Sequence, residues 1–128
     1  MVTDGAWDAG AEQGAAAWVC QSEGEFCGLC QVETLASSSS TAVEVRAGLL
    51  ALSWAKEHNI DRVLIQTDSL LFVLGLQNEE TASLDIQFML SDFKSLCNSF
   101  SFVKVVKVGR TLVKEAHALA REALTGMY

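Results

Sequence analysis

Proline is absent from this chain of 128 residues, although about 5 % is average, and no linker or internal repeat divides it. No uncharged run approaches the roughly 20 apolar residues that a membrane span requires, so we expect no membrane segment. The N-terminus has an acid, Asp4, and no basic stretch, which argues against a secretory signal peptide. Because half of its residues are hydrophobic, the chain is predicted to form one globular domain over residues 1–128.

Basic residues are scarce, because 9 Lys and Arg stand against 16 Asp and Glu and leave a net charge of −7. This acidity argues against unspecific nucleic-acid binding as the main task. Residues 94–121 are the exception, since six basic residues minus one acidic residue give +5 there. Two interpretations stay open, a local anion-binding face on an acidic body or an ordinary solvated surface.

The chain has four cysteine residues. Cys27 and Cys30 have the CxxC spacing, but no second pair and no nearby histidine completes a zinc site. The segment around them is predicted to be a strand, in which residues three apart point to opposite faces. We therefore expect Cys20, Cys27, Cys30 and Cys97 to be buried, reduced structural residues. Reduced thiols fit an intracellular compartment, nuclear or cytoplasmic.

Hydrophobic spacing predicts the secondary structure along the chain. Strands are expected over residues 1–3, 14–21, 25–35, 62–67 and 102–108. Helices are expected over residues 41–58, 69–76, 84–100 and 111–125, with a polar loop over 77–81 and Gly126 as the end of the last helix. The first strand is unusually short, which indicates truncation. Meandering strands followed by alternating helices and strands predict an α/β fold with a mixed sheet, part antiparallel and part parallel.

Three acids stand at the expected ends of these elements. Asp4 follows the first strand, Glu44 lies in the first turn of the long helix, and Asp68 ends the fourth strand. Strand ends and the start of a covering helix meet at one edge of such a sheet, so we expect the three carboxylates to converge. They would repel each other unless a cation lay among them, and hard oxygen ligands suit Mg²⁺ or Mn²⁺. Paired ions of this kind can hold the attacking water and the leaving oxygen of a phosphodiester.

Each acid also has a purely structural interpretation. Asp4 before Gly5 suits a turn. Glu44 could instead close a capping box with Thr41, and Asp68 could cap the helix that follows it. The joint occurrence of the acids, in this order and on this topology, favours the metal site.

The tryptophans allow a nucleic-acid interpretation as well, because indole rings can stack on bases. Trp18 and Trp54 fall on apolar strand and helix patterns, so we expect them in the core. Trp7 is expected in a loop beside Asp4, where both interpretations stay open.

Short motifs recur in order along nearly the whole chain. They are TDGAW at 3–7, GAAAWV at 14–19, TAVEVRA at 41–47 with LLAL at 49–52, IQTDS at 65–69, and Arg110 with AHALA at 116–120. This ordered set resembles ribonuclease H domains, and among them the reverse-transcriptase-like subgroup abundant in plant genomes. The resemblance implies the ribonuclease H-like fold, a five-stranded mixed sheet with three antiparallel and then parallel strands, flanked by helices.

The resemblance also implies an activity, the endonucleolytic, Mg²⁺-dependent hydrolysis of the RNA strand in RNA–DNA hybrids, with Mn²⁺ as a second candidate. Asp4, Glu44 and Asp68 fall on three of the family's four acidic metal-binding positions, and the fourth position falls on His117. The hybrid would be recognised through 2′-hydroxyl and backbone contacts in the minor groove. Phosphate contacts would be made by Lys104, Lys107, Arg110 and Lys114, if they face the site.

The final motif departs from the family pattern. A histidine at position 117 also resembles many plant members. Its neutral imidazole brings no negative charge and is a poor ligand for Mg²⁺, although it can relay a proton near pH 7. The alternative, a histidine on the helix surface without a role, stays open. Lys107 stands where relatives often have histidine, and Val113 where asparagine is common. Residues 77–87 are acidic and lack the basic substrate-gripping protrusion of bacterial relatives.

Two hypotheses about function therefore stay open. The first is a hybrid-cleaving enzyme in which Asp4, Glu44 and Asp68 are catalytic and His117 assists them. The second is a catalytically weak or inactive interaction module with a protein partner, within a larger retroelement-derived or host protein. In both cases a monomer is expected.

Overall fold

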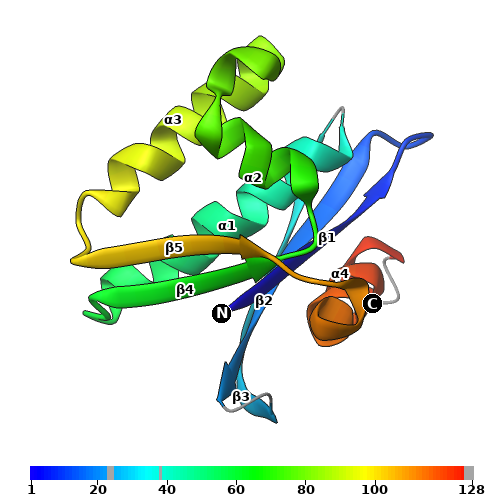
Figure 1. The fold of residues 1–128 in the computed structure, drawn as a ribbon. Coiled ribbons are helices and arrows are strands. Elements are labelled where there is room, and N and C mark those ends of the chain that lie inside the picture. Colours follow the sequence, from blue (N-terminus) through cyan, green and yellow to red (C-terminus); the bar gives the residue numbers. More distant parts are fainter. Residues whose placement is uncertain (23–24, 38, 126–128) are drawn as a thin grey trace.

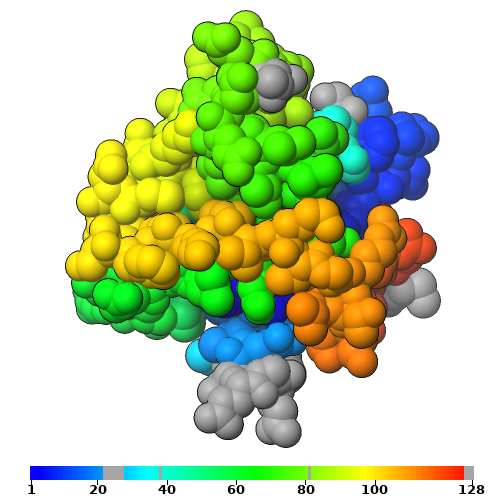
Figure 2. Space-filling model, viewed as in Figure 1, coloured from blue at the N-terminus to red at the C-terminus, as the bar shows by residue number. Residues whose placement is uncertain are grey.

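One mixed sheet organises the computed structural model, which describes residues 1–22, 25–37 and 39–125 (Figure 1). The strand order is β3-β2-β1-β4-β5. The strands are β1 (Val2–Asp8), β2 (Gln13–Ser22), β3 (Glu25–Ala36), β4 (Arg62–Thr67) and β5 (Phe102–Lys107). β1, β2 and β3 are antiparallel neighbours, whereas β4 is parallel to β1 and β5 to β4. The predicted mixed sheet is confirmed, and Figure 2 shows β5 exposed at its edge.

Helices cover the two faces of the sheet unequally (Figure 1). The helices are α1 (Ser40–Glu57), α2 (Leu70–Gln77), α3 (Leu84–Cys97) and α4 (Lys114–Thr125), with short 3₁₀ turns η1 (Glu79–Thr81) and η2 (Arg110–Val113). The first three pack with one face of the sheet, and α4 packs on the other face over β1 and β2. Among the described residues, no helix has the length and apolar character needed to cross a membrane.

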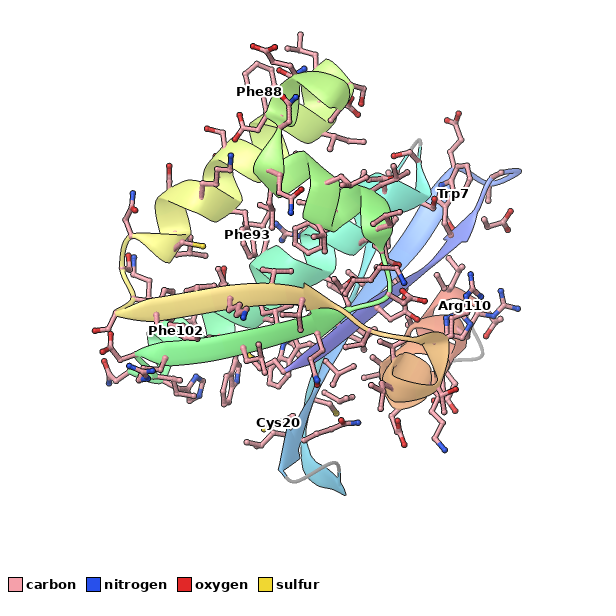
Figure 3. The ribbon with its side chains drawn as sticks, viewed as in Figure 1. Trp7, Cys20, Phe88, Phe93, Phe102 and Arg110 are labelled. Carbon is pink, nitrogen blue, oxygen red and sulfur yellow. The ribbon has the colours of Figure 1, made fainter. Side chains whose placement is uncertain are left out.

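Large apolar side chains fill the space between the sheet and α1, α2 and α3. Phe72 of α2 and Phe93 of α3 meet edge to face with ring centroids 5.4 Å apart, and Phe93 lies between α3 and the sheet (Figure 3). Ile65 of β4 and Leu52 of α1 complete this cluster and are fully buried. Each such side chain contributes roughly 1.5–3 kcal/mol through removal from water. This core holds α1 and β4 in place, and both carry candidate site residues.

Small side chains line the opposite face. Ala15 and Ala17 of β2 pack against Ala120 of α4, with Ala6 of β1 beside them. Because alanine side chains are short, the backbone of α4 lies close to β1 and β2. Alternate residues of β1 therefore face different helices, since side chains along a strand point alternately to its two sides.

The first strand is longer than predicted. β1 has seven residues and pairs with β2 along its whole length, from Val2 with Val19 to Asp8 with Gln13. The prediction of a short strand over residues 1–3 is therefore wrong. So is the turn interpretation of Asp4, which lies inside β1. Ladder hydrogen bonds to a distant strand outweigh the local turn preference of an Asp-Gly pair.

The helix caps also differ from prediction. The Ser39 hydroxyl caps α1 by accepting from the amide of Ala42 at 3.1 Å, so the capping box of Thr41 and Glu44 is wrong. The hydroxyl of Ser69 caps α2 by accepting from the amide of Phe72 at 3.2 Å, so Asp68 is not the cap. Serine hydroxyls satisfy these first-turn donors and leave both carboxylates available for other contacts.

Two predicted helices have different bounds. The helix expected over 111–125 starts as η2 and becomes α-helical at Lys114, and the helix expected over 84–100 ends at Cys97. The predicted loop over 77–81 contains η1. The predicted helix end at Gly126 and the side chain of Cys27 lie outside the described residues.

The thiols of Cys30 and Cys97 are free, as predicted, but the predicted burial of Cys20, Cys30 and Cys97 is wrong. Cys20 and Cys97 are half-buried, and Cys30 is exposed on β3, which is an edge strand of the sheet.

The tryptophans occupy different environments. Trp18 is fully buried, as predicted, whereas Trp54 is half-buried and stacks on His58 with ring centroids 4.0 Å apart. Trp7 lies in β1 and not in a loop. Its Nε1 donates to the carbonyl oxygen of Ser37 at 3.0 Å, which ties β1 to the segment that leads into α1.

Candidate metal centre

Three carboxylates from different elements meet at one cavity. Asp4 comes from β1, and Asp68 directly follows β4. Glu44 comes from the second turn of α1, and not from the first turn as predicted, because the helix begins at Ser40. One oxygen from each lies within 4.8 Å of the others. The cavity measures about 310 Å³ and is lined by Asp4, Gly5, Ser40, Thr41, Glu44, Asp68, Ser69, Leu70, Leu71, Arg110 and His117. The predicted convergence of the three acids is thus present in the structure.

Asp4 lies at the base of this cluster and is 4 % exposed. Its Oδ2 lies 2.9 Å from Nδ1 of His117 in α4, a hydrogen bond that an imidazole N–H would donate to the carboxylate. Burial raises the pKa of Asp4, and the charge of Asp68 raises it further, while Glu44 and His117 act in the opposite direction. The net direction of the pKa of Asp4 is upward, because burial makes its charged form more costly than in water.

The carboxyl group of Glu44 is held by the backbone of β1. Its Oε1 accepts from the amide of Gly5 at 3.0 Å. Its Oε2 is buried without a hydrogen-bond partner among the described residues. Burial, followed by the nearby charge of Asp4, raises the pKa of Glu44 from 4.5 to about 10. The folded protein therefore keeps this carboxyl protonated near neutral pH when no cation is bound.

These features fit a divalent cation. A partnerless buried oxygen is costly and needs either a proton or a positive ion. Carboxylate oxygens are hard ligands of the kind that Mg²⁺ and Mn²⁺ take. Asp4, Glu44 and Asp68 are the residues that would hold such an ion, and the imidazole of His117 is held beside them through Asp4.

Asp68 connects the cluster to a basic residue at the mouth of the cavity. The Nε of Arg110, in η2, lies 3.8 Å from Oδ2 of Asp68. The side chain of Arg110 is 91 % exposed, against 15 % for Asp68, and Figure 3 shows it on the side of the molecule where η2 leads into α4. The guanidinium can therefore reach a ligand in solvent while the carboxylate below stays enclosed.

The sequence matches a known protein family over residues 2–123, and the family is described as reverse transcriptase-like. The chain belongs to this family. The ribonuclease H-like identity expected from the motifs is confirmed, whereas membership of the plant subgroup stays a prediction. No curated protein sequence matches the chain.

Solved structures show the same fold. The ribonuclease H1 of the archaeon Halobacterium salinarum is 23 % identical, with a TM-score of 0.84 over 98 % of this chain and 96 % of that one. The N-terminal ribonuclease H domain of a Mycobacterium tuberculosis protein is 16 % identical, with a TM-score of 0.84 over 98 % and 93 %. LC11 ribonuclease H1, solved with an RNA/DNA hybrid, is 17 % identical, with a TM-score of 0.86 over 98 % and 95 %. The ribonuclease H-like fold predicted for this domain is confirmed.

The four basic residues predicted to bind phosphate do not share one location. Arg110 lines the cavity of the reverse transcriptase-like domain together with the acids. Lys104 lines a different hollow, between α2, α3 and β5. Lys107 and Lys114 are exposed and do not line the acidic cavity. The structure therefore brings one of the four, Arg110, to the acids.

Sequence reasoning missed the contribution of Gly5. Its backbone amide holds one oxygen of Glu44, although the Asp-Gly pair had suggested a turn. The available signal was a glycine inside an apolar strand, which marks a place where another group approaches the backbone closely. Ser40 and Thr41 also line the cavity, and no motif singled them out as site residues.

Proposed function

We propose that this ribonuclease H-like domain is an endonuclease that hydrolyses the RNA strand of RNA–DNA hybrids with the help of a divalent metal ion. The observation that carries the proposal is the convergence of Asp4, Glu44 and Asp68 within 4.8 Å at an open cavity. The LC11 ribonuclease H1, which has the same fold, was solved in complex with an RNA/DNA hybrid, and this supports the choice of substrate.

The three carboxylates would hold the ion, with Mg²⁺ as the first candidate and Mn²⁺ as the second. When bound, it would supply charge stabilisation for the phosphate oxygens and a more acidic water. Glu44 must lose its proton to become a ligand, so metal binding by this chain releases protons. The amide of Gly5 keeps one oxygen of Glu44 in place during that change.

Two further side chains would act on the substrate. Since Nδ1 of His117 is bonded to Asp4, its Nε2 is the ring atom free to give a proton to, or take one from, a group in the cavity. The guanidinium of Arg110 stands at the mouth, where its planar donors suit a phosphate of the bound strand.

A protein-binding module is the second candidate function. Leu70, Leu71 and Leu74 on α2 are 50, 63 and 42 % exposed, and the first two line the acidic cavity. Exposed leucines beside a site more often contact a protein than a phosphate backbone. His117 in place of a fourth acid also favours this candidate.

A cleavage assay separates the two candidates. Wild-type protein is incubated with a labelled RNA–DNA hybrid and either Mg²⁺ or Mn²⁺, beside single-stranded RNA and double-stranded DNA. We expect cleavage of the RNA in the hybrid alone. Asp68→Asn should abolish it, whereas Asp92→Asn, the same change at an exposed acid of α3, should leave it intact. A folded wild-type protein that cleaves no hybrid with either metal contradicts the enzyme proposal.

A further inference from the structure

Val43, the residue before Glu44, packs into the space above two glycines of the sheet. Val43 is 1 % exposed. A Cβ atom on Gly5 of β1 would lie 2.5 Å from Cγ1 of Val43, and a Cβ atom on Gly14 of β2 would lie 2.4 Å from its Cγ2. The two methyl groups of one valine therefore occupy the places that side chains on both glycines would fill.

The side chain of Val43 cannot easily move aside to make room for a new side chain at either glycine. Valine in a helix has essentially one χ1 rotamer, so neither methyl can rotate away. A backbone carbonyl also lies close to each position, because the Cβ on Gly5 would lie 3.3 Å from the oxygen of Ala15 and that on Gly14 would lie 3.2 Å from the oxygen of Ala6. A side chain at either glycine would therefore displace α1 from the sheet.

The position of α1 matters because Glu44 follows Val43 directly. The Oε1 of Glu44 accepts from the amide of Gly5 at 3.0 Å, and the same carboxyl belongs to the cluster with Asp4 and Asp68. A hydrogen bond of this kind weakens steeply when its partners separate or misalign. Moving the start of α1 outward would therefore remove Glu44 from both the amide and the other carboxylates.

We propose that Gly5, Gly14 and Val43 are positioning residues for the metal centre. They set the depth at which α1 packs on β1 and β2, and so hold the Glu44 carboxyl against the Gly5 amide and beside Asp4 and Asp68. The inference rests on the proposed function for the role of the centre, but the positioning itself can be measured without substrate. Gly14 does not line the acidic cavity. A substitution at Gly14 therefore tests the positioning of α1 without changing a residue that would contact a ligand.

The chain offers a matched control for the change at Gly14. Gly75 of α2 is also buried, and a Cβ there would lie 2.8 Å from Cδ1 of Leu90 in α3. Gly75→Ala thus inserts the same methyl group at another buried glycine, against the end of a leucine side chain between α2 and α3 and away from Val43. The rescue variant combines Gly14→Ala with Val43→Ala, which removes both methyl groups that the new Cβ would meet.

The experiment compares Gly14→Ala, Val43→Ala, the double variant and Gly75→Ala with wild type. The readouts are the NMR resonance of the Gly5 amide proton in metal-free protein, Mg²⁺ affinity by calorimetry, and hybrid cleavage. Gly14→Ala should move the Gly5 resonance towards that of a Glu44→Gln reference. It should also weaken Mg²⁺ binding and cleavage by about 10–100-fold, the usual effect of losing an orienting contact at a metal site. The double variant should return all three readouts towards those of Val43→Ala, and Gly75→Ala should change none of them.

A folded Gly14→Ala protein with the wild-type Gly5 resonance and Mg²⁺ affinity overturns the proposal, as does a double variant no better than Gly14→Ala. If Gly14→Ala does not fold, Val43→Ala and the double variant decide. Equal Gly5 resonances in those two support the positioning role, and different ones overturn it. Wild-type protein that cleaves no hybrid contradicts the proposed function alone, because the Gly5 resonance needs neither metal nor substrate.

Discussion

Nδ1 of His117 in α4 lies 2.9 Å from Oδ2 of Asp4 in β1, although 113 positions separate the two residues in the chain. The side chain of Asp4 is 6 % exposed and that of His117 48 %. The histidine therefore joins a buried acid to the open cavity. The small alanines between α4 and the sheet make this contact possible, because they let the helix approach β1.

Replacing His117 should affect both stability and activity. His117→Ala removes the partner of a buried carboxyl and is expected to lower the unfolding free energy by about 1–3 kcal/mol. If the imidazole transfers protons, cleavage should fall by roughly 10²-fold or more, and the pH profile of cleavage should change. Denaturant unfolding and the pH profile of cleavage test both parts. Unchanged cleavage and an unchanged profile would exclude His117 from the reaction.

Restoring an acid at this position tests the electrostatics of the centre. His117→Asp adds a carboxylate next to Asp4, so Mg²⁺ should bind more tightly than to wild type, while the metal-free protein should lose stability through repulsion between like charges. Calorimetric titration with Mg²⁺ and thermal unfolding in a chelator measure the two effects. Weaker Mg²⁺ binding by a folded His117→Asp protein would show that position 117 does not face the ion. His117→Asn provides the uncharged comparison.

The stability of the metal-free protein should fall as pH rises. The pKa of Glu44 is about 10 in the folded protein and 4.5 ordinarily, so between these values the folded state holds a proton that the unfolded state has lost. In that window this group lowers the unfolding free energy by about 1.4 kcal/mol for each pH unit. Glu44→Gln should remove this dependence. Denaturant unfolding between pH 5 and about 8 measures it, and equal slopes for both proteins would contradict the assigned protonation.

Divalent metal should reverse this loss of stability. Binding to the folded state alone stabilises it by about 3 kcal/mol at a concentration 100 times the dissociation constant. The rise in Tm with Mg²⁺ should be larger at pH 8 than at pH 6, because binding must displace the proton of Glu44. Scanning calorimetry with and without chelator tests this. Asp68→Asn should show little rise, and a rise equal to that of wild type would place the ion elsewhere.

Arg110 and Lys104 should differ in their effect on the hybrid. Arg110→Ala removes the cation at the mouth of the cavity, so KM for the hybrid should rise and the slope of log K against log salt should decrease by about one. Lys104→Ala is the matched control, since that lysine lines a hollow between α2, α3 and β5. Binding titrations at several salt concentrations measure both. Equal effects would favour one extended basic face, as residues 94–121 had suggested.

The spacing of hydrophobic residues and the short motifs in the sequence were enough to predict the helices, the strands and the family of this protein. Val43, Ala47, Leu50 and Trp54 recur at helical spacing and form part of α1 as predicted, because a 3.6-residue period depends only on near neighbours. The order of elements followed in the same way, and the spaced motifs were enough to indicate the ribonuclease H-like fold. The three acids could also be predicted as site residues, because each of them stands at the end of a strand or near the start of a helix that the sequence predicts.

Tertiary structure decided the contacts that these residues make. Asp4 suits a turn by itself, and only pairing with β2 places it inside β1. Glu44 fits a capping box with Thr41, yet packing of Val43 on Gly5 and Gly14 turns its carboxyl to the Gly5 amide instead. Short-range preferences of about 1 kcal/mol yield to strand pairing and close packing between segments far apart in the chain. The sequence alone therefore determined the three acids and the histidine of the candidate metal centre, and the tertiary structure decided their distances, partners and protonation.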